Sequence, residues 1–141
     1  MYCDLLYKVM SIVPKVIVVD EVQSHLDVFC EFLRLKNIDV VGIGSDGLEA
    51  VQLYEKHHPD IVLIDLAMPT YDGHYALNKI MSINKNARII IMTAIEDIKN
   101  KRLLLESGAM DVLQKPFELN RVVEVINNVC KDQKIISKKF S

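Results

Sequence analysis

The chain has few cysteines and no long apolar run, and each shortage excludes a class of protein. Its three cysteines, Cys3, Cys30 and Cys130, form neither a C-x-x-C pair nor a Cys/His spacing that suits zinc. They indicate reduced thiols, so we expect a cytoplasmic protein. No apolar run approaches the roughly 20 residues of a transmembrane helix, and we expect no membrane partner.

The sequence also has little net charge. Its 17 basic and 19 acidic residues give a net charge of −2, so no basic field of the kind that attracts nucleic acid is present. Of the 141 residues, 50% are apolar and 26% are charged, which is typical of globular proteins. This length suits one domain, which can bury a core without disulfides or structural metals.

Short apolar segments alternate with helical patterns along the chain. Four segments are rich in β-branched residues and apolar on both faces, which is typical of buried parallel strands. They predict strands at residues 16–19, 40–43, 61–64 and 89–92, and position predicts a fifth at 110–114. Apolar residues recur at helical spacing between them, most clearly at 26–33 and 119–126. Five β-α units predict a doubly wound α/β sandwich.

The two ends of the chain differ from this pattern. Asp4 and Lys8 interrupt the apolar start, which therefore fits a secretory signal poorly. Residues 1–13 are either an N-terminal extension or a translated leader ahead of a start at Met10. Residues 132–141 are polar and basic, which predicts a solvated tail, with a docking tail as the alternative. We expect one stand-alone domain at 14–131, without an output domain.

Polar residues follow the predicted strands where each one ends. Asp20 and Glu21 follow the first strand, Asp65 ends the third, Thr93 ends the fourth and Lys115 follows the fifth. In open α/β sheets ligands bind beyond the carboxyl ends of the strands. Three carboxylates gathered there would raise one another's pKa, and a divalent cation relieves that repulsion. Magnesium prefers such oxygen ligands; the alternative is that each residue is an ordinary polar cap.

Four motifs at these strand ends resemble those of response-regulator receiver domains. They are V-V-D-E at Val18–Glu21, P-D-I-V-L-I-D-L-A-M-P at Pro59–Pro69 followed by Asp72-Gly73, M-T-A at Met92–Ala94 and K-P-F at Lys115–Phe117. The resemblance covers roughly residues 14–131. It implies a flavodoxin-like (βα)5 fold with a five-stranded parallel sheet in the order 2-1-3-4-5, the order of the chemotaxis receiver.

The resemblance also implies roles for single residues. Asp65 would accept a phosphoryl group, assisted by Thr93 and Lys115. Magnesium would be held by Asp20, Glu21, Asp65 and the backbone carbonyl of Ala67. The phosphoryl donor would be a sensor histidine kinase or a phosphotransfer protein.

By the same resemblance the chain would be a signalling switch rather than an enzyme. Its altered surface would be recognised by a downstream protein, and a homodimer is conceivable. The alternative is a phosphorylation-independent adaptor or dimerisation module of the same fold.

Two positions depart from the family pattern. The acidic pair is usually Asp-Asp, whereas Glu21 here adds one methylene and changes the reach of that ligand. Val112 stands where the family commonly has a Tyr or Phe that turns inward when the threonine moves. Valine has one restricted torsion and too little volume for that movement. We therefore expect the response to run through residues 93–108, with at least one of Leu103, Leu104 and Leu105 exposed.

Three other patterns suggest different functions and are set aside. Gly42–Gly47 spells the dinucleotide fingerprint G-x-G-x-x-G, but it follows the second strand rather than the first. A haloacid-dehalogenase-like phosphatase would have a second aspartate where Ala67 stands. The dispersed His25, His57, His58 and His74 are expected to be surface or loop residues.

Overall fold

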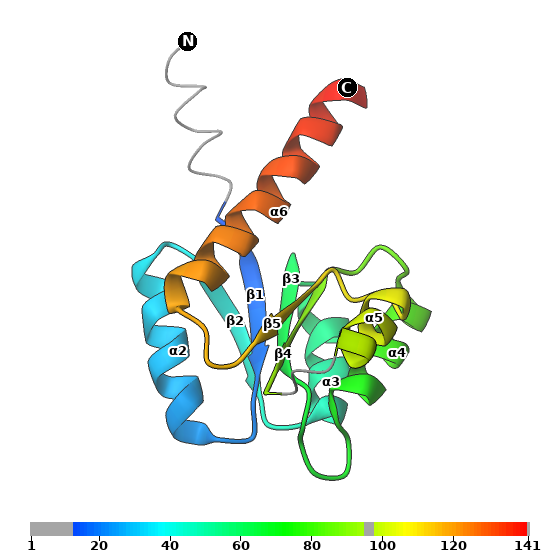
Figure 1. Ribbon diagram of the computed structural model, residues 1–141. Coiled ribbons are helices and arrows are strands. Elements are labelled where there is room, and N and C mark those ends of the chain that lie inside the picture. Colours follow the sequence, from blue (N-terminus) through cyan, green and yellow to red (C-terminus); the bar gives the residue numbers. More distant parts are fainter. Residues whose placement is uncertain (1–12, 95–97, 141) are drawn as a thin grey trace.

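The computed structural model describes residues 13–94 and 98–140, without the side chains of 98 and 131–140. Strands and helices alternate along these residues (Figure 1). The strands are β1 (Lys15–Val19), β2 (Asp39–Gly44), β3 (Ile61–Asp65), β4 (Ile89–Thr93) and β5 (Asp111–Gln114). The helices are α2 (Gln23–Leu35), α3 (Gly47–His57), α4 (Gly73–Ile83), α5 (Ile98–Glu106) and α6 (Leu119–Phe140).

The five strands form one parallel sheet in the order β2-β1-β3-β4-β5. This confirms the predicted fold class. Asp65 at the end of β3 pairs with Met92, and Thr93 at the end of β4 pairs with Gln114. The register therefore brings the ends of β3, β4 and β5 to one edge of the sheet.

Apolar side chains of the strands point alternately to the two faces of the sheet. Ile17, Ile64 and Ile91 pack in a core cluster with residues of α3, α4 and α5, whereas Val18 and Leu63 pack with residues of α2 and α6. The helices cover the sheet on both sides (Figure 1). Burying each such side chain contributes about 1.5–3 kcal/mol, which explains why the central strands have no polar alternation.

Two aspartates fix the beginnings of the helices next to the carboxyl edge. Asp46 accepts a hydrogen bond from the backbone N–H of Glu49 at the start of α3, and Asp72 accepts one from Tyr75 at the start of α4. Such N-caps each stabilise a helix by about 1 kcal/mol. They fix the points at which the loops after β2 and β3 end and α3 and α4 begin.

The outer segments add three findings. Leu104 is buried, whereas Leu103 and Leu105 are 54% and 41% exposed, which confirms the expected exposure on α5.

The backbone of α6 continues to Phe140, so the tail predicted at 132–141 begins inside this helix. The domain boundaries at residues 13 and 131 stay a prediction. No helix of the described chain combines the length and apolar character needed to cross a membrane.

Candidate functional site

Three buried polar side chains lie at the carboxyl edge of the sheet. Asp20, Asp65 and Thr93 are only 6%, 8% and 5% exposed. Asp20 directly follows β1, and the other two end β3 and β4. Burying charged groups costs free energy unless they are paired or bind a cation, so their position indicates a functional site.

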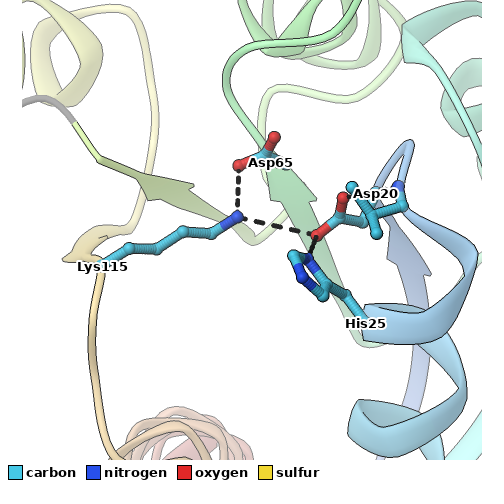
Figure 2. A network of polar contacts seen from close by, with 5 residues as sticks. Asp20, His25, Asp65 and Lys115 are labelled. Carbon is cyan, nitrogen blue, oxygen red and sulfur yellow. Dashed lines mark hydrogen bonds and ion pairs between the residues drawn. The ribbon is translucent and has the colours of Figure 1, made fainter.

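Lys115 connects the two buried aspartates. Its Nζ lies 2.9 Å from Asp65 Oδ1 and 3.6 Å from Asp20 Oδ2 (Figure 2). The backbone N–H of Lys115 donates to the carbonyl oxygen of Thr93 at 2.7 Å, which anchors the residue just beyond β5. The structure thus brings together the predicted site residues Asp20, Asp65, Thr93 and Lys115.

His25 is a neighbour of this site that sequence reasoning missed. It belongs to the first turn of α2, and its Nδ1 lies 3.8 Å from Asp20 Oδ2 (Figure 2). The other oxygen, Asp20 Oδ1, accepts from the backbone N–H of Val22 at 3.0 Å. The side chain of His25 is 61% exposed, as expected for a surface histidine. The signal that could have found it is its place in the first turn of the helix after Asp20.

Glu21 and Ala67 are less closely joined to the site. Both residues are exposed. Within residues 13–94 and 98–140 no three His, Cys, Asp or Glu side chains form a group that could hold a metal ion. The structure therefore assembles two of the three predicted carboxylates around an ammonium group, and the roles of Glu21 and Ala67 stay predictions.

Burial and pairing act against each other at Asp65 and Lys115. Burial raises the pKa of Asp65, and it outweighs the hydrogen bond and charge of Lys115, which lower it. Burial lowers the pKa of Lys115, but the hydrogen bond and charge of Asp65, together with Asp20, raise it overall. The contact with Lys115 therefore offsets only part of the effect of burial on the pKa of Asp65.

Residues 16–127 match the family model of the response regulator receiver domain. The chain belongs to this family. Receivers are switches of two-component signalling rather than enzymes, they typically bind Mg²⁺, and their usual partner is a histidine kinase. The predicted family, fold and class of protein are thereby confirmed.

Several curated proteins are similar to this receiver. It is 34% identical to chemotaxis protein CheY of Thermotoga maritima over 117 residues, which cover 83% of this chain and 98% of that protein. It is also 34% identical to CheY of Bacillus subtilis, over 80% of this chain and 94% of that protein. The response regulator DctR of Priestia megaterium is 35% identical, but the match spans only 46% of its length.

Solved structures agree with this assignment. The receiver domain of the Francisella response regulator 1452 superposes with a TM-score of 0.80 at 31% identity, over 85% of this chain and 98% of that one. CheY in the CheX-CheY-BeF3-Mg complex of Borrelia burgdorferi gives a TM-score of 0.78 at 29% identity, over 82% and 87% of the two chains.

A hollow of about 450 Å³ opens beside Asp20 and Lys115 of this receiver. Phe29 of α2 and Phe117 of the β5–α6 loop meet edge to face in it, with ring centroids 6.2 Å apart. Its apolar lining also includes Met92 and Pro116, and its polar lining is formed by Asp20, His25 and Lys115. The hollow therefore offers an incoming group an apolar wall within reach of the charged site.

The glycine-rich loop of this receiver has a structural role. The backbone N–H of Ser45 donates to Glu49 Oε1 at 2.7 Å, and that of Gly47 donates to the carbonyl oxygen of Tyr71, also at 2.7 Å. A dinucleotide fingerprint needs such N–H groups for the pyrophosphate. Here they bind the protein itself, which agrees with setting the nucleotide interpretation aside.

Proposed function

We propose that this receiver accepts a phosphoryl group on Asp65 from the phosphohistidine of a sensor histidine kinase or a phosphotransfer protein. The observation that carries the proposal is the contact of 2.9 Å between Lys115 Nζ and Asp65 Oδ1 in a buried site that also holds Asp20. A downstream protein would then recognise the altered surface.

The side chains support this reaction in separate ways. A carboxylate oxygen of Asp65 attacks phosphorus, the bond from phosphorus to the donor nitrogen breaks, and an acyl phosphate forms. Lys115 stays protonated because its pKa is raised, so it can neutralise phosphoryl charge. The Thr93 hydroxyl lies at the end of the neighbouring strand and can donate a hydrogen bond. Phosphoryl transfer depends mainly on such positioning and charge.

The residues present fit a magnesium ion. Asp20 and Asp65 supply buried carboxylate oxygens, and Mg²⁺ binds through one or two carboxylates while keeping several waters. Glu21 and the carbonyl of Ala67 would complete the protein ligands. When bound, the ion would neutralise charge on the phosphoryl oxygens.

The proposal is tested by incubating the chain with acetyl phosphate, with and without Mg²⁺. Intact-mass spectrometry should show one added phosphoryl group, which chelation of the metal prevents. An unlabelled chain under both conditions would instead support the phosphorylation-independent adaptor.

Glu21→Gln is expected to weaken Mg²⁺ binding by roughly tenfold, because a charged group beside Asp20 is lost. Isothermal titration with Mg²⁺ measures the change. Glu31→Gln on the exposed side of α2 is the matched control and should bind Mg²⁺ as the unaltered chain does. Equal affinities for both variants would mean that Glu21 serves another purpose.

The remote response to phosphorylation is expected to bypass Val112. This residue is 7% exposed and packs in the core cluster that contains Leu104 and Ala109. A switch needs two packings of similar energy, which a valine there does not supply. On adding beryllofluoride and Mg²⁺, amide-exchange changes should concentrate at residues 93–108, which include the exposed Leu103 and Leu105.

Asp65→Asn is the control for this experiment, since it removes the carboxylate to which beryllofluoride would bind. If the largest amide-exchange changes instead occur at β5 and α6, then Val112 does not prevent the response from passing through these elements. Absence of any response in the unaltered chain would favour the adaptor.

A further inference from the structure

The acceptor loop, residues 66–72 between β3 and α4, holds one residue in a strained conformation. Thr70 has a φ of 67°, in the left-handed region that a β-branched residue adopts only at a cost in free energy. Such a conformation persists only where the surrounding contacts impose it. The neighbours of the acceptor loop therefore fix its shape, and with it the position of Ala67, the proposed carbonyl ligand.

Backbone hydrogen bonds attach the acceptor loop at both ends. At its start the N–H of Leu66 donates to the carbonyl oxygen of Met92 at 2.8 Å. At its end the carbonyl oxygen of Tyr71 accepts from the N–H of Gly47 at 2.7 Å. Gly47 is the first residue of α3 and is buried. Ala67 lies between these two attachments, so the start of α3 helps to set where its carbonyl group stands.

The attachment at Gly47 leaves no room for a side chain. An added Cβ there would overlap the carbonyl oxygen of Asp72 and would lie 2.9 Å from that of Tyr71. Both are backbone atoms of the acceptor loop, so no side-chain rotation relieves the contact. Three residues earlier, the carbonyl oxygen of Gly44 accepts from the backbone N–H of Asp20 at 3.1 Å. The glycine-rich loop thus contacts both Asp20 and the acceptor loop.

We propose that Gly47 is a positioning residue for phosphorylation, which acts by holding the acceptor loop and the carbonyl group of Ala67 in place. The inference rests on the proposed function, because it requires Mg²⁺ and phosphoryl transfer at Asp65. A shift of the Ala67 carbonyl would weaken Mg²⁺ binding but would leave the nucleophile intact. Additional Mg²⁺ should therefore compensate for the shift.

The experiment follows acetyl phosphate labelling of the unaltered chain, Gly47→Ala and Gly42→Ala by intact-mass spectrometry over a Mg²⁺ titration. Gly47→Ala should raise the Mg²⁺ concentration for half-maximal labelling by about tenfold and should approach the rate of the unaltered chain at saturating Mg²⁺. Gly42→Ala is the matched control, because its added Cβ would meet the flexible side chain of Leu53, and it should need no additional Mg²⁺. A rate for Gly47→Ala that is equally reduced at every Mg²⁺ concentration would show a general loss of fold and overturn the inference.

A second measurement needs no metal. In NMR spectra of the metal-free chain, Gly47→Ala should shift the amide signals of residues 66–72 more than Gly42→Ala does. Asp46→Ala is a milder variant, because it removes only the oxygen that caps α3 directly before Gly47. It should raise the Mg²⁺ requirement in the same direction, whereas Asp46→Asn keeps an acceptor oxygen and should behave as the unaltered chain does.

Circular dichroism checks that each variant is folded, and the two Asp46 variants decide the question if Gly47→Ala is not. An unchanged Mg²⁺ requirement in the folded variants of Gly47 and in Asp46→Ala would overturn the inference and leave the proposed function intact. An unaltered chain that stays unlabelled would instead overturn the proposed function, on which the inference rests.

Discussion

Replacing Asp65 by asparagine should abolish phosphoryl labelling of the chain while leaving its fold as stable as before or more stable. Labelling is lost because an amide does not act as the carboxylate nucleophile. Intact-mass spectrometry after acetyl phosphate and Mg²⁺ treatment measures it. Asp27→Asn on the exposed side of α2 is the control and should be labelled normally. Undiminished labelling of the Asp65 variant would refute the assignment of the acceptor.

The expected stability follows from the raised pKa of Asp65, which burial causes. Because the fold holds the proton more tightly than the unfolded chain does, the favourable contribution of protonated Asp65 is complete below the ordinary pKa of 3.8. It is lost as the pH rises through the raised value. At neutral pH the ionised side chain therefore disfavours folding, and a neutral amide removes that cost.

Urea unfolding of the unaltered chain and Asp65→Asn at neutral pH measures this difference. The two free energies of unfolding should converge as the pH falls through the raised pKa of Asp65 toward 3.8, because Asp65 then becomes neutral as well. A marked loss of stability in the variant at neutral pH would show that the ion pair with Lys115 outweighs burial.

Gly73→Ala should disturb the acceptor loop, residues 66–72, which joins Asp65 at the end of β3 to Gly73 at the start of α4. An added Cβ would lie 2.8 Å from the carbonyl oxygen of Asp65 and 2.9 Å from Leu66 Cα. These are backbone atoms, which have no side-chain rotation to relieve the contact. The backbone N–H of Gly73 also donates to the carbonyl oxygen of Leu66 at 2.8 Å, so the loop and α4 shift together. We expect a loss of about 1–3 kcal/mol in the free energy of unfolding.

The same substitution should also reduce phosphoryl labelling, because it displaces Asp65 relative to Lys115. Gly42→Ala in β2 is the matched control. Its added Cβ would meet Leu53 Cδ2 at 2.9 Å, the end of a flexible side chain, so the loss of stability should be smaller and labelling should persist. Equal losses of labelling in the two variants would contradict a specific effect at the acceptor loop.

The sequence by itself determined the strands, their alternation with helices and the chemical groups at the strand ends. Strands such as β3 and β4 are buried on both faces, so every position before the final Asp65 and Thr93 is apolar. This pattern is evident without knowledge of the neighbours. Asp65 and Thr93 could be singled out because each stands where such an apolar run stops, and Lys115 because it follows the fifth predicted strand. The receiver motifs then supplied a role for each group.

Only the tertiary structure decided which of these groups touch. The contact of Lys115 with both Asp20 and Asp65 depends on the order of the strands and on the direction of a long side chain. The approach of His25 to Asp20 and the exposed position of Glu21 depend on how α2 leaves β1. Periodicity along the chain contains no information on rotamers or on distances between elements, because packing between the elements sets both.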